Sequence, residues 1–272
     1  SLTGVGNTGI AAGDSYVGIE NLYGSQHDDT LMGDALNNWL YGGDGNDSLN
    51  GGAGNDLLQG ADGLDTLAGG LGNDTYLIDT ADLIFEDLNA GIDTVMVDFA
   101  AYTLGDHLER LVYTGAGTFS ASGNALANFI SSGAMDDSLI GAAGNDSLVA
   151  GDGNDTLIGG AGADSLNGGN GVDFVSYATA TGSVAVSLTT NTGTLGEALG
   201  DVLVGIEYLH GSGFNDTLVG NAGANSLMGA NGNDLLNGGA GVDTLDGGEG
   251  DDILVGGIGV DTYYGGNGVD TV

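Results

Sequence analysis

An aspartate recurs every nine residues over much of this chain, and a regular row of carboxylates suits a hard divalent cation. The repeated unit is G-G-x-G-x-D-x-(apolar)-x, and it is complete at 42–50 and at 51–59. The sixth residue is Asn at 38, 128 and 225 and Asp in the other units. The spacing predicts that these sixth-position aspartates are metal ligands: Asp29, Asp47, Asp56, Asp65, Asp74, Asp137, Asp146, Asp155, Asp164, Asp173, Asp216, Asp234, Asp243, Asp252, Asp261 and Asp270.

Calcium explains why these residue types occur at this spacing. The ion takes six to eight oxygen ligands at about 2.3–2.6 Å. Turns rich in glycine can point carbonyl oxygens inward, because glycine adopts positive φ without a steric penalty. Stacked carboxylates repel one another at the ~4.8 Å spacing of strands, and an interleaved cation turns this repulsion into attraction. The alternative, in which these Asp and Asn residues only close Asx-turns, leaves the acidity of the chain unexplained.

The charge balance of the 272 residues is extreme, with 38 acidic residues against the single base Arg110 and a net charge of −37. A hydrophobic content of 41% and a mean hydropathy of +0.10 argue against disorder. The absence of cysteine excludes disulfides and Cys-ligated zinc. With one base, the chain is not expected to bind nucleic acid, and no apolar run is long enough for a membrane span.

Three blocks hold the nine-residue repeat in unbroken phase, and other segments separate them. Residues 13–33 match 200–220 at a constant offset, which assigns the first segment to the end of a connector. Both chain ends fall inside the pattern, so we expect either a piece cut from a longer protein or a mature product. The predicted division is a connector tail at 1–23, block 1 at 24–77, a β-rich connector at 78–122, block 2 at 123–176, a β-rich connector at 177–210 and block 3 at 211–272.

The last three residues of each unit should form a strand. By the two-residue alternation of strands, position eight points into the core and positions seven and nine point outward. Position nine is nevertheless often apolar, which fits either a surface that meets another surface or single exposed side chains beneath connector loops. These residues are Met32, Tyr41, Ile140, Val149, Ile158, Val219, Met228, Val255 and Tyr264.

The repeat resembles the calcium-binding nonapeptide of the RTX (repeats-in-toxin, haemolysin-type) proteins. The connector sequence 200–207 also resembles segments found between such blocks in secreted proteins. The resemblance implies an all-β fold, a parallel β-roll or β-helix solenoid with two nonapeptides per coil. In that family six residues form the turn and three the strand, and Ca²⁺ ions are interleaved between units n and n+2.

Applied to this sequence, that rule pairs sixth-position residues 18 apart and implies about 10–13 Ca²⁺ ions. Pairs that contain Asn, such as Asn38 with Asp56, Asn128 with Asp146 and Asn225 with Asp243, carry less charge. The pairs with two carboxylates are Asp29–Asp47, Asp47–Asp65, Asp56–Asp74, Asp137–Asp155, Asp146–Asp164, Asp155–Asp173, Asp216–Asp234, Asp234–Asp252, Asp243–Asp261 and Asp252–Asp270.

The connectors carry their own signals. Residues 82–87, 91–97 and 184–188 alternate as strands do, and a short helix is expected near Glu197. Glu86 and Asp93 are candidates for a further cation site.

No catalytic constellation is present in the sequence, so we expect a protein that is not an enzyme. The chain has neither H-E-x-x-H nor a G-x-S-x-G elbow. His27 and His210 are expected in turns, and His107 lies beside Glu109 and Arg110, where a local ion pair is the simpler explanation.

The sequence therefore predicts a calcium-binding structural module that folds in a calcium-dependent way, in a secreted or cell-surface bacterial protein. The resemblance implies an extracellular location and one-step (type I) secretion, with low calcium inside the cell and high calcium outside. One hypothesis is self-association in a surface layer, fibre or adhesin. The alternative is the non-catalytic folding and secretion domain of a type I-secreted protease, lipase or toxin.

Overall fold

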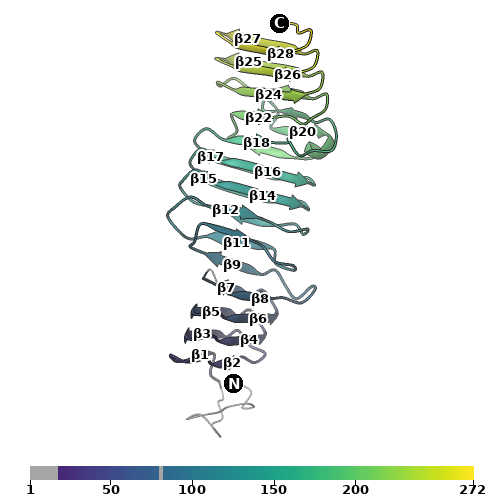
Figure 1. Ribbon diagram of the computed structural model, residues 1–272. Helices are drawn as coiled ribbons and strands as arrows, with labels where there is room; N and C mark the ends of the chain where they lie inside the picture. Colours follow the sequence, from purple (N-terminus) through teal and green to yellow (C-terminus); the bar gives the residue numbers. More distant parts are fainter. Residues whose placement is uncertain (1–17, 80–81) are drawn as a thin grey trace. The chain divides into compact units, whose positions relative to one another are not determined.

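The computed structural model describes residues 18–79 and 82–272, and Figure 1 shows strands such as β3 and β5, or β14 and β16, stacked in successive coils. Apart from the short 3-10 helix η2 (Gly196–Ala198), all the regular structure described is β. The described chain is therefore an all-β parallel solenoid, which confirms the fold class expected from the sequence. It divides into two compact units, one ending at Gly115 and the other running from Ala116 to Val272.

The first unit is built from two parallel sheets whose strands alternate along the chain. One sheet has the order β1-β3-β5-β7-β9-β11, and the other has the order β2-β4-β6-β8. The strands of this unit are β1 (Asn21–Tyr23), β2 (Thr30–Met32), β3 (Trp39–Asp44), β4 (Ser48–Ala53), β5 (Leu57–Asp62), β6 (Thr66–Leu71), β7 (Thr75–Leu77), β8 (Leu83–Phe85), β9 (Thr94–Val97), β10 (Ala101–Thr103) and β11 (Arg110–Tyr113).

The second unit repeats this design around an inserted hairpin. Its strands are β12 (Ser120–Ser122), β13 (Phe129–Ser131), β14 (Ser138–Ala143), β15 (Ser147–Asp152), β16 (Thr156–Ala161), β17 (Ser165–Asn170), β18 (Phe174–Ser176), β19 (Ala185–Ser187), β20 (Thr192–Leu195), β21 (Val202–Val204), β22 (Tyr208–His210), β23 (Thr217–Val219), β24 (Ser226–Asn231), β25 (Leu235–Gly241), β26 (Thr244–Glu249), β27 (Ile253–Gly259) and β28 (Thr262–Asn267). One sheet runs β12-β14-β16-β18-β22-β24-β26-β28, and the other runs β13-β15-β17-β21-β20-β19-β23-β25-β27. Only β20 is antiparallel to its neighbours among these described pairings.

Strand register confirms that two nonapeptides make one coil. Leu40 pairs with Leu58, and Leu139 pairs with Leu157, each 18 residues along the chain. The eighth position therefore stacks directly on its equivalent in the next coil, and its side chain fills the core. These residues are almost fully buried from Leu31 to Leu254, as predicted, and the exceptions are Tyr263 and Val272 near the end, at 37% and 77% exposure.

Most strands inside the blocks are longer than the three residues that the resemblance implied, while β2, β7, β13, β18 and β23 at the block ends do have three. In β4 the pairing continues through the two glycines that open the next unit, with Gly52 opposite Gly70. The second glycine has positive φ, +107° at Gly52, and so bends the chain without losing its place in the sheet. Alanine replaces it at Ala61, Ala142 and Ala230, each at a φ between 73° and 83°.

The connector predictions are largely confirmed. The structure has β8 and β9 within 82–87 and 91–97, β19 within 184–188, and η2 at Glu197. The matching segments 13–33 and 200–220 contain the equivalent strands β1 and β22. Each of them pairs with the strand that lies 18 residues further along the chain. For the connector tail predicted at 1–23, residues 1–17 lie outside the described residues.

The ninth position points outward, as predicted, but its exposure varies. Met32, Met228, Val255 and Tyr264 are 41–57% exposed, and the others in this set are half-buried. No helix among residues 18–79 and 82–272 is long and apolar enough to cross a membrane.

The close stacking of turns yields a test with a matched control. A Cβ on Gly162 would lie 1.7 Å from the carbonyl oxygen of Gly144, and the φ of Gly162 is +155°. Gly162→Ala is therefore expected to destabilise the calcium-loaded protein by roughly 2–4 kcal/mol. Gly182→Ala is the control, because an added Cβ there meets nothing within 4 Å.

Urea denaturation at saturating calcium measures both variants. Equal midpoints for the two would contradict the stacking geometry.

Candidate metal centres

A ladder of hydrogen bonds joins the sixth-position residues of successive coils. Within a block, the backbone N–H of one donates to Oδ1 of the sixth-position residue 18 further on, at 2.7 Å for Asp47 and Asp65. The structure brings together every pair of carboxylates expected from the repeat. The other nine are Asp29–Asp47, Asp56–Asp74, Asp137–Asp155, Asp146–Asp164, Asp155–Asp173, Asp216–Asp234, Asp234–Asp252, Asp243–Asp261 and Asp252–Asp270, at 2.7–3.1 Å.

The second oxygen of most of these carboxylates has no hydrogen-bond partner in the described structure. A buried, unpartnered carboxylate oxygen is costly, because desolvation penalises the charge and nothing offsets it. The row therefore has the chemistry of a set of ligands. The sixth-position residues with such an Oδ2 are Asp47, Asp56, Asp65, Asp74, Asp146, Asp155, Asp164, Asp173, Asp234, Asp243 and Asp252, each at most 2% exposed.

The first glycine of the unit leaves room for these oxygens to converge. A Cβ on Gly42 would lie 2.1 Å from Asp47 Oδ2 and 2.7 Å from the carbonyl oxygen of Gly60. At Gly42 the absence of a side chain keeps that space open between the carboxylate and a carbonyl of the next coil. Both are hard oxygen ligands of the kind that Ca²⁺ prefers, so the residues present fit this ion.

The first two units of each block are built differently. In these units the second residue lacks positive φ. Its N–H instead donates to the side-chain oxygen of the sixth residue in the same unit. The bonds run from Ser25 to Asp29, Asp34 to Asn38, Asn124 to Asn128, Gly133 to Asp137, Ser212 to Asp216 and Asn221 to Asn225. All three asparagines of the row occur here, so the residues that begin each block are those whose oxygen already has a partner.

Burial raises the pKa of several carboxyls in the row. The pKa of Asp56 and that of Asp146 rise to about 6, first because burial disfavours the charge. The neighbouring carboxylates, Asp74 and Asp164 respectively, also raise the pKa, and the backbone N–H of the ladder opposes both effects. In the absence of a cation, these groups therefore hold protons more tightly in the fold than in an unfolded chain.

Connector acids continue the ladder where the nonapeptide pattern stops, and the sequence did not predict this. Asp74 N–H donates to Asp93 Oδ1 at 2.7 Å, and Asp93 N–H donates to Glu109 Oε2 at 2.9 Å. The available signal was an acid directly before a short strand with an apolar second residue. Three more acids act in the same way. Asp82 accepts the N–H of Asp65, Asp201 that of Asp164 and Glu207 that of Asp173.

The fold and the site define a class of protein, a parallel β-solenoid with buried carboxylate rows along its turns. The RTX calcium-binding nonapeptide repeat family matches at 23–58, 41–76, 122–157, 140–175, 204–236 and 237–272, which is more than half of the chain. The chain belongs to this family and is a calcium-binding repeat module. A search of the curated proteins finds no match to it.

The raised pKa values predict an unusual pH response of the metal-free protein. Asp56, Asp146, Asp155 and Asp234 have pKa values of about 6, compared with 3.8 for an unperturbed Asp. The stabilisation from their protonation is complete below about pH 4 and is lost as the pH rises through about 6. In a chelator, the β-sheet circular dichroism signal should therefore be stronger at pH 4.5 than at pH 7.5.

With calcium the order should reverse, since protons compete with the metal for the same carboxylates. Sedimentation at each pH distinguishes folding from aggregation near the isoelectric point. A metal-free signal that does not change between these pH values would contradict the prediction.

Proposed function

We propose that the chain is a structural module of a secreted or cell-surface protein, which calcium folds outside the cell. The observation that carries this proposal is the set of buried sixth-position oxygens without a hydrogen-bond partner. Nothing within the described protein offsets the desolvation penalty of these charged oxygens, and a bound divalent cation would offset it. We assign no catalytic role to the chain.

The residues that would hold the metal are the sixth-position aspartates with carbonyls of the unit's first glycines. About 10–13 ions would cancel most of the net charge of −37. Without them, repulsion keeps the chain expanded, and with them the free energy of binding becomes free energy of folding. Affinities of about 10⁻⁴–10⁻³ M per site are sufficient for an extracellular module. A chain unfolded at low internal calcium is compatible with one-step export.

Self-association in a surface layer, fibre or adhesin is supported by an aromatic cluster in the first unit. The ring of Tyr23 lies 5.5 Å from that of Trp39 and 5.8 Å from that of Tyr41. Tyr23 is 60% exposed and Trp39 36% exposed. Along the same row of strands lies a hollow that is lined by Leu77, Ile78 and Met96 and also by Asp62, Asp79 and Asp98. Exposed aromatic groups are typical of interaction surfaces, and we propose a second copy as the partner.

The alternative is the non-catalytic folding and secretion domain of a larger secreted protease, lipase or toxin. The same metal-gated folding supports it, and it requires no contact between copies.

Circular dichroism and sedimentation, with and without calcium, test both levels of the proposal. We expect calcium to produce the β-signal and concentration-dependent assembly, with a change in the fluorescence of Trp39, the only tryptophan. A β-signal that EDTA leaves unchanged at neutral pH would refute metal-gated folding. A calcium form that stays monomeric at high concentration would favour the folding-domain alternative.

A single ligand can be tested with Asp155→Asn. Asparagine occurs naturally at this position of the unit and keeps an acceptor for the N–H of Asp137, but it removes the charge of the unpartnered oxygen. We expect the calcium concentration at half-folding to rise about 2–10-fold.

Asp152→Asn is the matched control, because Asp152 is exposed and the change in net charge is the same. Equal calcium midpoints for the two variants would exclude Asp155 as a ligand.

A further inference from the structure

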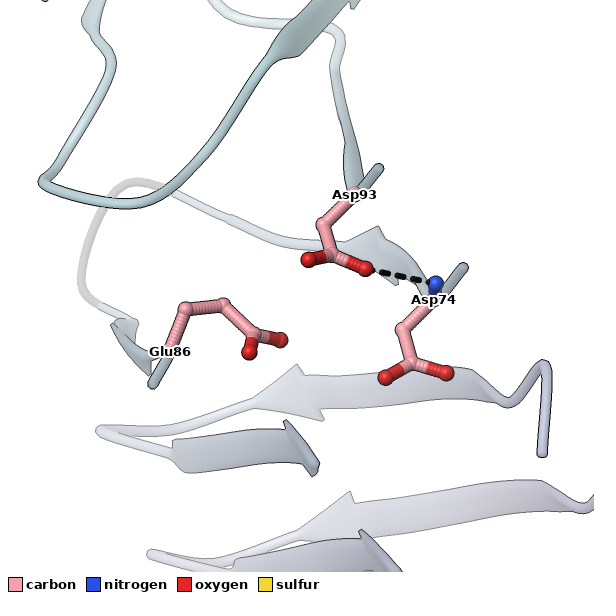
Figure 2. Close-up of side chains that lie close together, drawn as sticks. All are labelled: Asp74, Glu86 and Asp93. Atoms are coloured by element: carbon pink, nitrogen blue, oxygen red, sulfur yellow. Dashed lines mark hydrogen bonds between the residues drawn. The ribbon is translucent and has the colours of Figure 1, made fainter. Parts of the chain in front are cut away.

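Three carboxylates converge where block 1 meets its connector. Asp74 comes directly before β7, Glu86 directly after β8 and Asp93 directly before β9. One carboxylate oxygen from each lies within 4.8 Å of the others. Figure 2 shows the side chain of Glu86 reaching from the neighbouring strand toward Asp74 and Asp93.

The hydrogen bonds at this place leave buried oxygens without partners. Asp93 Oδ1 accepts the N–H of Asp74, and Asp74 Oδ1 accepts the N–H of Asp56, both at 2.7 Å. Asp74 Oδ2 and Asp93 Oδ2 have no hydrogen-bond partner in the described structure, and the two residues are 1% and 0% exposed. Both carboxylates belong to the cluster, so the desolvation of their unpartnered oxygens points to a cation rather than to a solvated acidic patch.

Glu86 makes this place different from the sites within the repeat. Phe85 pairs with Ala68, so Glu86 is in register with Gly69, the first glycine of its unit. In block 1 this position is always glycine, in block 2 Ser132 and Ala150 also occupy it, and no unit has an acid there. A Cβ on Gly69 itself would lie 2.2 Å from Asp74 Oδ2. Glu86 occupies the equivalent position one coil further on, and its side chain is the third carboxylate of the cluster.

Tyr76 holds that third carboxylate in place. It occupies the eighth position of its unit, where the other units of block 1 have leucine, and it is fully buried. Its hydroxyl accepts the N–H of Gly69 at 2.7 Å and donates to Glu86 Oε1. A buried hydroxyl requires such partners, and here it fixes the direction of the glutamate.

We propose that Asp74, Glu86 and Asp93 bind one hard cation of the Ca²⁺ class more tightly than the two-carboxylate sites of the repeat. Charge count is a main determinant of affinity at oxygen sites, and this cluster has one charge more than a repeat pair. The site joins the last nonapeptide of block 1 to the connector strands β8 and β9. The inference rests on the proposed calcium-binding function.

Terbium is a suitable probe, because it is a hard cation of similar chemistry and tyrosine can sensitise its emission. The hydroxyl of Tyr76 contacts Glu86, so the first equivalents of Tb³⁺ added to the full chain should give Tyr-sensitised luminescence. Glu86→Gln should weaken this first binding phase at least about tenfold, as measured by competition with Ca²⁺. Asp87→Asn is the matched control, because it removes the same charge from an exposed neighbour and should leave the phase unchanged.

Tyr76→Phe is the second variant, and circular dichroism at saturating calcium checks that each protein folds. Tyr76→Phe should abolish most of the emission of the first phase, since the nearest sensitiser is gone. The inference is overturned if Glu86→Gln and Asp87→Asn have the same first phase, or if the emission survives in Tyr76→Phe. Failure of the proposed function gives a different result, because the unsubstituted chain would then show no calcium-dependent folding at all.

Discussion

The row of buried carboxylates is the constraint on which the rest of the structure depends. Each carboxylate in the interior of a block uses Oδ1 to accept a backbone N–H from the preceding coil, and this bond fixes the register of 18 residues. The second oxygen then lies in a desolvated position without a partner, beside a like charge. The geometry that aligns the coils therefore also creates the need for a cation. One oxygen of the side chain aligns the coils, and the other oxygen of the same side chain requires the cation.

The glycines follow from this arrangement. Where coils stack so that a carbonyl of one lies against the α-carbon of the next, no side chain fits, as the 1.7 Å approach at Gly162 illustrates. The second glycine of the unit also turns its own N–H away from the sixth residue. At Ser25 and Asn124 the turn lacks positive φ, and the N–H bonds the sixth side chain instead. The φ angle of the second residue therefore decides between two turns. In one, the sixth side chain accepts a hydrogen bond from its own unit, and in the other its second oxygen is available to a metal.

Much of the fold could be predicted from the sequence because it is strictly periodic. Leucine at the eighth position and aspartate at the sixth carry the core and the ladder, and both are visible as spacing alone. The partner of Asp29 Oδ2 was not predictable, since it depends on the φ of Ser25. The acids Glu109 and Asp201 were missed because no glycine frame marks them, although each occupies the sixth-position place in its coil. The approach of Glu86 to Asp74 and Asp93 lies in a connector where the step from Asp74 to Asp93 is one residue longer than the repeat, so the period of 18 does not reveal it.

The inserted hairpin of the second unit has an evolutionary consequence. Asp164 N–H donates to Asp201 Oδ1 across 37 residues of sequence rather than 18, and Asp173 reaches Glu207 across 34. The spatial step between coils is kept while the chain between them is lengthened by β19, β20 and η2. One acid before a short strand is sufficient to rejoin the stack. Such an array can acquire new loops between coils without losing its continuity, and sequence diversity in proteins of this design should therefore concentrate at these junctions.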